Sequence, residues 1–265
     1  MSTQVAVGSV KGAPGASTLA LALGWCWAAT GPVVVAEVDP AGADLAFRLG
    51  VAAEPGLAGL AAVARRSLSP EVLGAHTQPL TDRLGLLAGC VNGAEARAAL
   101  ATVGAGLVGA ARSAGSVGIW DCGRLGPATA EVSTAVDVVV VVCRAEPSAL
   151  AHLVAAASEL AGGTAQVAVV LVVGGRRRQW PVSAAEASAA VAARLPDGMG
   201  VVGTVPVDDL GVRALERGPG RWARRSALGT AAAALATHLD ELAATGAAAS
   251  GPGVVLPLAV QAGQR

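Results

Sequence analysis

Five consecutive valines, Val138 to Val142, constrain the fold of this chain more than any other feature of its sequence. β-Branched residues favour strands, and a strand without apolar–polar alternation is buried on both faces. Such strands are typical of parallel sheets that are covered by helices. Similar apolar runs along the chain predict strands at Gln4–Val10, Pro32–Val38, Leu84–Ala88, Val117–Asp121, Asp137–Val142, Gln166–Val173 and Gly200–Val205.

Alanine-rich stretches alternate with these strands and predict helices at Ser17–Ala29, Gly93–Ala114, Pro147–Leu160, Ser183–Arg194 and Trp222–Ala244. Alternating strands and helices predict an α/β fold, with a doubly wound, mostly parallel sheet of about seven strands and helices on both faces. We expect one domain over residues 1–244. Residues 245–265 are rich in Gly, Ala and Pro, and we expect them to form a flexible tail.

The composition excludes several classes of protein. Hydrophobic residues make up 53% of the chain and charged residues 14%, which excludes disorder over most of it. The formal net charge of +0 argues against constitutive binding to polyanions. No apolar run approaches the roughly 20 residues of a membrane helix, and the sequence shows neither a basic leader nor a basic amphipathic helix that would target a membrane. We therefore expect a cytoplasmic protein.

The residues that most often build metal and hydrolase sites are scattered. The four cysteines are far apart and form no C-x-x-C pair: Cys26, Cys90, Cys122 and Cys143. This spacing disfavours a zinc or iron–sulfur site. The three histidines are equally isolated: His76, His152 and His238. No nucleophile pattern accompanies them, so a hydrolase triad is unsupported.

A glycine-rich loop between the first predicted strand and helix is the strongest functional signal. It reads K-G-A-P-G-A-S-T over residues 11–18. Backbone N–H groups in such a loop converge on a phosphate, to which the helix N-terminus adds its positive end. Ser17, at the helix start, is placed to bind Mg²⁺. Lys11 is the only lysine of the chain, which favours a specific role for a compact charge. The alternative is an ordinary turn whose glycines serve backbone geometry alone.

This loop resembles the deviant Walker A motif, K-G-G-x-G-K-[ST], of the MinD/ParA family of P-loop ATPases. The matching positions are Lys11, Gly12, Gly15 and Ser17. The resemblance implies that ATP and Mg²⁺ bind at Gly12, Ala13, Pro14, Gly15, Ala16, Ser17 and Thr18. It also implies a nucleotide-dependent homodimer in which Lys11 acts catalytically, by reaching the phosphates across the dimer.

The loop departs from the family at two positions. Ala13 replaces a glycine, and Ala16 replaces the ordinary P-loop lysine. That lysine contacts the β- and γ-phosphates, and a charge-assisted contact contributes roughly 1.5–3 kcal/mol. We therefore expect nucleotide binding that is weakened but not abolished. Hydrolysis should be slow or impaired, because phosphoryl transfer depends on charge stabilisation in the transition state.

Carboxylates follow two of the predicted strands. The second strand ends in Glu37-Val38-Asp39-Pro40. By resemblance, Asp39 is the switch I aspartate that positions the attacking water, and Glu37 takes the place of the first acid of that motif. The alternative for Asp39 is an N-cap of a following short helix. Asp44 is either a helix cap or a supporting group near the site.

The strand at residues 117–121 ends in Asp121, which follows four apolar positions. This arrangement resembles Walker B, and it implies that Asp121 and Ser17 hold Mg²⁺, partly through water. The alternative is a strand-end aspartate that caps the next helix. Gly123 resembles the start of the family's switch II segment. Arg124 reaches either a phosphate or a partner, or it is a solvated loop residue.

The resemblance covers about residues 3–240, although its motifs are specific at only three places. Pro206 and Asp208 look like the V-P-x-D element that lies beside the adenine. The family's base-reading asparagine is missing, and Arg176-Arg177-Arg178 stands after that strand instead. Arginines near the C-terminal helix either bind DNA without sequence preference or form a solvated face: Arg213, Arg217, Arg221, Arg224 and Arg225.

The sequence therefore predicts an ATP-binding dimerisation switch of MinD/ParA type with slow or impaired hydrolysis. It would serve partitioning or spatial positioning of DNA or of a cell-envelope machine. The alternative is a degenerate, non-hydrolysing P-loop scaffold or regulator, like the pilus-localising relatives of MinD. A metal–sulfur carrier that pairs Cys90 and Cys122 is a third, disfavoured reading. So is an enzyme on a plain Rossmann fold, because no G-x-G-x-x-G follows the first strand.

Overall fold

A computed structural model describes residues 2–12, 14–28, 30–64, 68–163, 165–174, 184–218 and 221–246. Within these residues the chain forms an eight-stranded sheet with the order β3-β4-β2-β5-β1-β6-β7-β8. The strands are β1 (Gln4–Ser9), β2 (Val33–Glu37), β3 (Gln78–Pro79), β4 (Leu84–Leu87), β5 (Val117–Arg124), β6 (Val138–Arg144), β7 (Gln166–Val173) and β8 (Met199–Pro206). All neighbouring strands are parallel except β3 and β4. The predicted α/β fold is therefore confirmed.

The eighth strand corrects the expectation of about seven. β3 contains only two residues, Gln78 and Pro79, which pair antiparallel with Leu86 and Gly85 of β4 at one edge of the sheet. Proline is tolerated in an edge strand, where its missing N–H faces away from the ladder. So short a strand with no β-branched residue leaves no periodic signal in the sequence.

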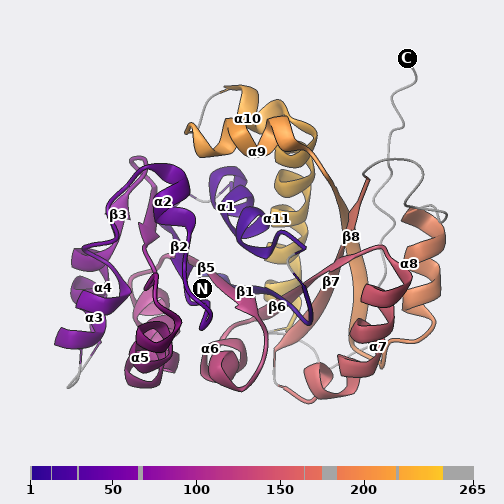
Figure 1. Cartoon of the computed structure of the whole chain (residues 1–265), viewed down its shortest axis with the longest axis horizontal. Helices are drawn as coiled ribbons and strands as arrows, with labels where there is room; N and C mark the ends of the chain where they lie inside the picture. The colour runs from indigo at the N-terminus through magenta and orange to yellow at the C-terminus, as the bar shows by residue number, and fades with distance from the viewer. Residues whose placement is uncertain are drawn as a thin grey trace.

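Helices cover both faces of the sheet (Figure 1). One face carries α1 (Ala16–Cys26), α2 (Leu45–Leu49), α9 (Asp209–Glu216), α10 (Arg221–Arg225) and α11 (Ala227–Gly246). The other face carries α3 (Leu57–Val63), α4 (Pro70–His76), α5 (Gly93–Ser113), α6 (Ala130–Ala135), α7 (Pro147–Ala161) and α8 (Ala184–Ala192). A single 3₁₀ turn, η1 (Pro127–Thr129), precedes α6.

The valine run behaves as the sequence predicts. Side chains alternate across β6, so Val138, Val140 and Val142 pack with α1 and α11 on one face. Val139 and Val141 pack with the helices of the other face. Because both faces are covered, every position of the run is buried, and no polar alternation is required.

The predicted helix Trp222–Ala244 is two helices. α10 ends at Arg225 and α11 begins at Ala227. Ser226 lies between them, where its hydroxyl donates to the carbonyl of Ala223 and accepts from the N–H of Gly229. Ser226 therefore acts as the N-cap of α11, a position at which serine is favoured.

α11 continues to Gly246, two residues beyond the predicted domain limit, and the remainder of the predicted tail lies outside the described residues. Among the helices that the structure describes, none is both long and apolar enough to cross a bilayer.

The carboxyl ends of the parallel strands lie at one edge of the sheet, and register pairs Asp121 of β5 with Val7 of β1 and Glu37 of β2. The residues singled out in the sequence therefore gather at that edge.

Candidate functional site

The glycine-rich loop joins β1 to α1 and forms an open cradle. Gly12 and Gly15 have φ values of +79° and +98°, which residues other than glycine rarely adopt. Gly15 is the N-cap of α1, and no side chain caps the helix. A Cβ added at either glycine would meet nothing within 4 Å, so space in front of the loop is open. The uncapped N–H groups of the first turn suit an anion. Ala13 lies outside the described residues.

Lys11 is exposed and turns toward α7 of its own chain. Its Nζ lies 2.8 Å from Nε2 of His152. The two residues help to line a small pocket of about 200 Å³, together with Arg144 and Glu146 at the end of β6. The described conformation therefore gives the only lysine an imidazole neighbour within the same chain, whereas the sequence had suggested that this histidine is isolated.

Asp121 is one of two acids at this edge that are almost completely buried. It is 1% exposed, it accepts from the N–H of Gly123 at 3.2 Å, and the Ser17 hydroxyl lies near enough to lower its pKa. The pKa of Asp121 is raised to about 7, mainly by burial; the nearby charges of Glu37 and Asp39 act in the same direction, whereas Ser17 and the N–H of Gly123 act against it. The proximity of Ser17 and Asp121 follows from the parallel order of β1 and β5.

The donor set at Asp121 fits Mg²⁺. Hydroxyl and carboxylate oxygens are the ligands of this hard cation, which is usually held by one or two carboxylates, water and phosphate oxygens rather than by an all-protein cage. The described residues contain no group of three or more His, Cys, Asp or Glu side chains arranged around a common metal position. A bound cation would also favour the ionised form of Asp121, which burial disfavours.

Asp39 follows β2 and lies directly against the loop that follows β5. Its Oδ1 accepts from the N–H of Ala41 at 2.7 Å. A Cβ added to Gly123 would fall 1.8 Å from its Oδ2, and Gly123 has φ +57°. Burial raises the pKa of Asp39, and the charge of Asp44 adds to this, whereas Arg124 opposes it. The two loops that resemble switch I and switch II are thus in contact through Asp39 and Gly123.

Glu37 has a structural position that sequence reasoning missed. It is 1% exposed, and its Oε1 accepts from the N–H groups of Asp44 at 2.9 Å and Leu45 at 2.6 Å. Its Oε2 accepts from the N–H of Gly89 at 3.2 Å. Burial raises the pKa of Glu37, partly offset by these N–H donors. Glu37 therefore caps α2 from the strand before it and ties the β2 and β4 loops together.

Asp44 occupies the N-cap position of α2, but its side chain makes no capping bond. It pairs instead with Arg48, at 3.7 Å from Nη1. Arg48 also donates from Nη2 to the Thr18 hydroxyl at 3.0 Å and from Nε to Glu216 at 2.8 Å. Arg48 therefore connects α2, α1 and α9, and it holds the hydroxyl of one predicted nucleotide-binding residue. An arginine inside an apolar helix was the only signal for this contact in the sequence.

Pro206 and Asp208 lie at the same edge but three strands away from β1. Both carboxylate oxygens of Asp208 already accept backbone hydrogen bonds, from Gly211 at 2.9 Å and from Leu228 at 3.1 Å. Asp208 therefore caps α9 and fixes the start of α11. The arginines at 176–178 lie outside the described residues.

The remaining candidates divide into a basic surface and buried thiols. Four of the predicted arginines are exposed on α9, just after it and on α10: Arg213, Arg217, Arg224 and Arg225. The side chain of Arg221 lies outside the described residues. Cys90 and Cys122 are buried, and burial raises the pKa of both thiols, that of Cys90 to about 11. Neither thiol is prepared for metal binding as a thiolate.

No protein-family model matches the sequence, and no curated protein matches it by sequence. Solved structures match the fold. The cell division ATPase MinD of Pyrococcus furiosus has a TM-score of 0.71 at 19% identity, with 91% of this chain and 100% of that chain covered. A ParA family ATPase from Chlorobium tepidum has a TM-score of 0.71 at 16% identity, covering 90% and 100%.

The septum site-determining protein MinD of Pyrococcus horikoshii, complexed with Mg-ADP, has a TM-score of 0.62 at 18% identity, covering 94% of this chain and 100% of that one. Identities this low establish the fold and leave the chemistry to the residues themselves. Together with the strand order and the open loop after β1, these similarities show that the chain has the α/β fold of the MinD and ParA ATPases.

Proposed function

We propose that this chain is an ATP-binding dimerisation switch of MinD/ParA type with slow or impaired hydrolysis. The observation that carries the proposal is the placement of the Ser17 hydroxyl beside the buried Asp121 carboxylate, next to an open, uncapped glycine loop. This combination offers phosphate-binding N–H groups and a Mg²⁺-binding oxygen pair at one place. The Mg-ADP complex of the structurally similar P. horikoshii MinD supports it.

In this proposal, the loop at residues 12–18 surrounds the phosphates, to which the N–H groups of Gly12 and of residues 15–18 donate, and Ser17 and Asp121 hold Mg²⁺. The cation supplies charge neutralisation for the phosphates when it is bound. Asp39 orients a water from the loop after β2. Pro206 and Asp208 flank the base. Ala16 adds no charge, so hydrolysis is slow.

Lys11 is the dimerisation element of the proposal. It exchanges His152 for the phosphates of a nucleotide on a second copy of the chain. The output is partitioning or positioning of DNA or of a cell-envelope machine, in the cytoplasm. The exposed arginines on and beside α9 and α10 favour non-specific contact with DNA phosphates.

The alternative function is a non-hydrolysing P-loop scaffold or regulator. One observation favours it specifically: Ala16 is buried at the first position of α1 and carries no charge where the resembling family has a lysine. The two functions differ in turnover, which a comparison of variants measures directly.

Replacing Asp39 with alanine is expected to abolish phosphate release while Mg²⁺–ATP binding, measured by calorimetry, stays within a few-fold of the original. The reason is that Asp39 lies at the switch loops and not at the Ser17–Asp121 pair. Asp82→Ala is a matched control, because Asp82 is an exposed loop aspartate. Equal hydrolysis rates for the Asp39→Ala variant and the original protein would favour the scaffold. Undetectable binding at millimolar ATP would contradict both nucleotide-bound forms.

Replacing Lys11 with alanine is expected to abolish the ATP-dependent doubling of mass, as measured by light scattering, while ATP binding persists. His152→Ala is the control, because it removes the same hydrogen bond but keeps the lysine; it should dimerise with ATP at least as readily as the original chain. ATP-dependent doubling in the Lys11→Ala variant would contradict the proposed role of Lys11.

A further inference from the structure

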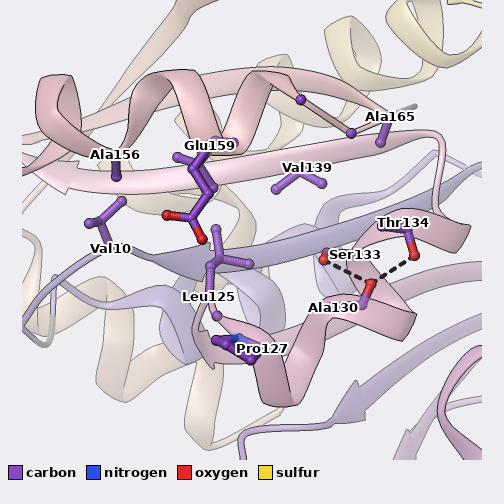
Figure 2. A pocket seen from close by; sticks show the side chains of 14 residues that line it. Val10, Leu125, Pro127, Ala130, Ser133, Thr134, Val139, Ala156, Glu159 and Ala165 are labelled. Atoms are coloured by element: carbon purple, nitrogen blue, oxygen red, sulfur yellow. Dashed lines mark hydrogen bonds between the residues drawn. The ribbon is translucent and has the colours of Figure 1, made fainter.

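A groove of about 410 Å³ runs between α6 and α7 and has no place in the proposed function. Its lining is mainly apolar, with Val139 of β6 as part of it (Figure 2). The hydroxyls of Ser133 and Thr134 donate to the carbonyl of Ala130 within their own helix. Glu159 is the only charged residue among those that line the groove, and Figure 2 shows its carboxylate turned toward Leu125. The groove therefore suits an apolar occupant with a single positive charge.

One end of the groove touches the candidate site. Val10, which precedes Lys11, and Leu125, which follows Arg124, both line it. Leu125 is fixed to β1, because its N–H donates to the carbonyl of Ser9 at 3.0 Å. A Cβ added at Gly8 would lie 2.7 Å from Leu125 Cγ. Anything that fills this end therefore packs against both the phosphate loop and the loop after β5.

The chain itself arrives at the other end of the groove. Ala165 lines that end and directly precedes Gln166, the first residue of β7. α11 ends at Gly246, where an added Cβ would lie 2.6 Å from Nε2 of Gln166. The last described helix, α11, therefore ends beside Gln166, whose neighbour in the sequence, Ala165, lines the groove.

The residues after Gly246 have the composition that the groove requires. Residues 247–253 read A-A-A-S-G-P-G, and Val254–Val260 reads V-V-L-P-L-A-V. Between 247 and 265 the sequence has no acid and one base, Arg265. An apolar run with one cation thus complements an apolar groove with one carboxylate.

We propose that Val254–Val260 docks in the α6–α7 groove of its own chain. Seven extended residues span about 23 Å, so the spacer 247–253 is long enough to round the edge of the sheet. The seven residues of the apolar run, Val254–Val260, then cover about the length of β6, which lies beneath the groove. Attachment at Gly246 makes the docking intramolecular, which raises the effective concentration of the segment to about the millimolar range.

Disulfide trapping in the full chain tests this docking. A variant with Leu256→Cys and Ser133→Cys should form an intrachain disulfide under mild oxidation at least about tenfold faster than one with Leu256→Cys and Ser158→Cys. Ser158 is the matched control, since it is exposed on α7 and does not line the groove. Equal rates for the two pairs would overturn the proposal, and a predominantly interchain disulfide would overturn its intramolecular form.

Hydrogen exchange gives a second readout without added cysteines. With Leu256→Asp and Leu258→Asp, amides of α6 and of residues 159–165 should exchange about fivefold faster or more than in the original chain. Gln261→Asp with Gln264→Asp adds the same charge outside the apolar run and should leave these rates unchanged. Identical exchange in the two double variants would overturn the proposal. Neither readout involves nucleotide, so failure here is distinct from failure of the proposed function.

Discussion

Replacing Glu37 with alanine is expected to lower the free energy of unfolding by about 3–5 kcal/mol. The substitution leaves three N–H groups without their acceptor, those of Asp44, Leu45 and Gly89. Leu45 and Gly89 are buried, and each unsatisfied buried donor costs about 1–3 kcal/mol. The loss should also detach the start of α2, because the side chain of its N-cap residue, Asp44, makes no capping bond. Urea denaturation followed by circular dichroism measures the effect.

Two further variants separate this capping role from a general need for charge at the sheet edge. Glu37→Gln keeps one carbonyl oxygen as acceptor and should lose less stability than Glu37→Ala. Asp39→Ala removes a neighbouring acid that accepts one N–H bond from its own turn, and it should change stability by about 1 kcal/mol or less. A Glu37→Ala variant as stable as Asp39→Ala would contradict the assignment of Glu37 as the cap of α2.

Replacing Asp121 with asparagine is expected to stabilise the nucleotide-free protein at pH 8 and to weaken Mg²⁺–ATP binding. The pKa of Asp121 is about 7 in the folded chain, against an ordinary value of 3.8. At pH values between these two pKa values, Asp121 is protonated in the folded state and ionised in the unfolded state. The contribution of Asp121 to stability therefore falls as the pH rises from about 4 to about 7, and it is constant above that.

The measurable quantity is the stability difference between the variant and the original chain. It should grow by about 3 kcal/mol in favour of the variant between pH 5 and pH 8, in chemical denaturation without nucleotide. Burial also raises the pKa values of Glu37 and Asp39, so the original chain itself should lose stability in the same direction. Asp82→Asn, at an exposed loop position, should show no growing difference. A difference that does not change with pH would contradict the raised pKa that burial gives to Asp121.

The sheet and the gathering of the loops could be predicted from the sequence because both follow from local pattern and strand direction. Valine runs without alternation require cover on both faces. Parallel strands bring their carboxyl ends to one edge, and this places Ser17 beside Asp121 although they are distant in the sequence. These features depend on periodicity and topology, which a single sequence contains.

Contacts between loops could not be predicted in this way. Glu37 at the end of β2 meets Gly89 after β4, and Lys11 of the glycine-rich loop meets His152 of α7, only because the tertiary fold brings these distant segments together. Glu37 and Asp208 accept hydrogen bonds from backbone N–H groups. Every residue except proline has such a group, so the sequence does not indicate which ones will be bonded. Helices of five to eight residues, such as α2 and α9, are too short for a 3.6-residue periodicity to stand out.

The exposed position of Lys11 makes the chain unusually simple to interrogate by covalent chemistry. It is the only lysine in the sequence, and its Nζ lies at the surface beside the loop that forms the candidate site. An amine-directed acylating reagent therefore has one side chain to modify. The rate of that modification reports directly whether the loop is bare, occupied or covered by another molecule, and one acyl group would remove the lysine's charge from the whole protein.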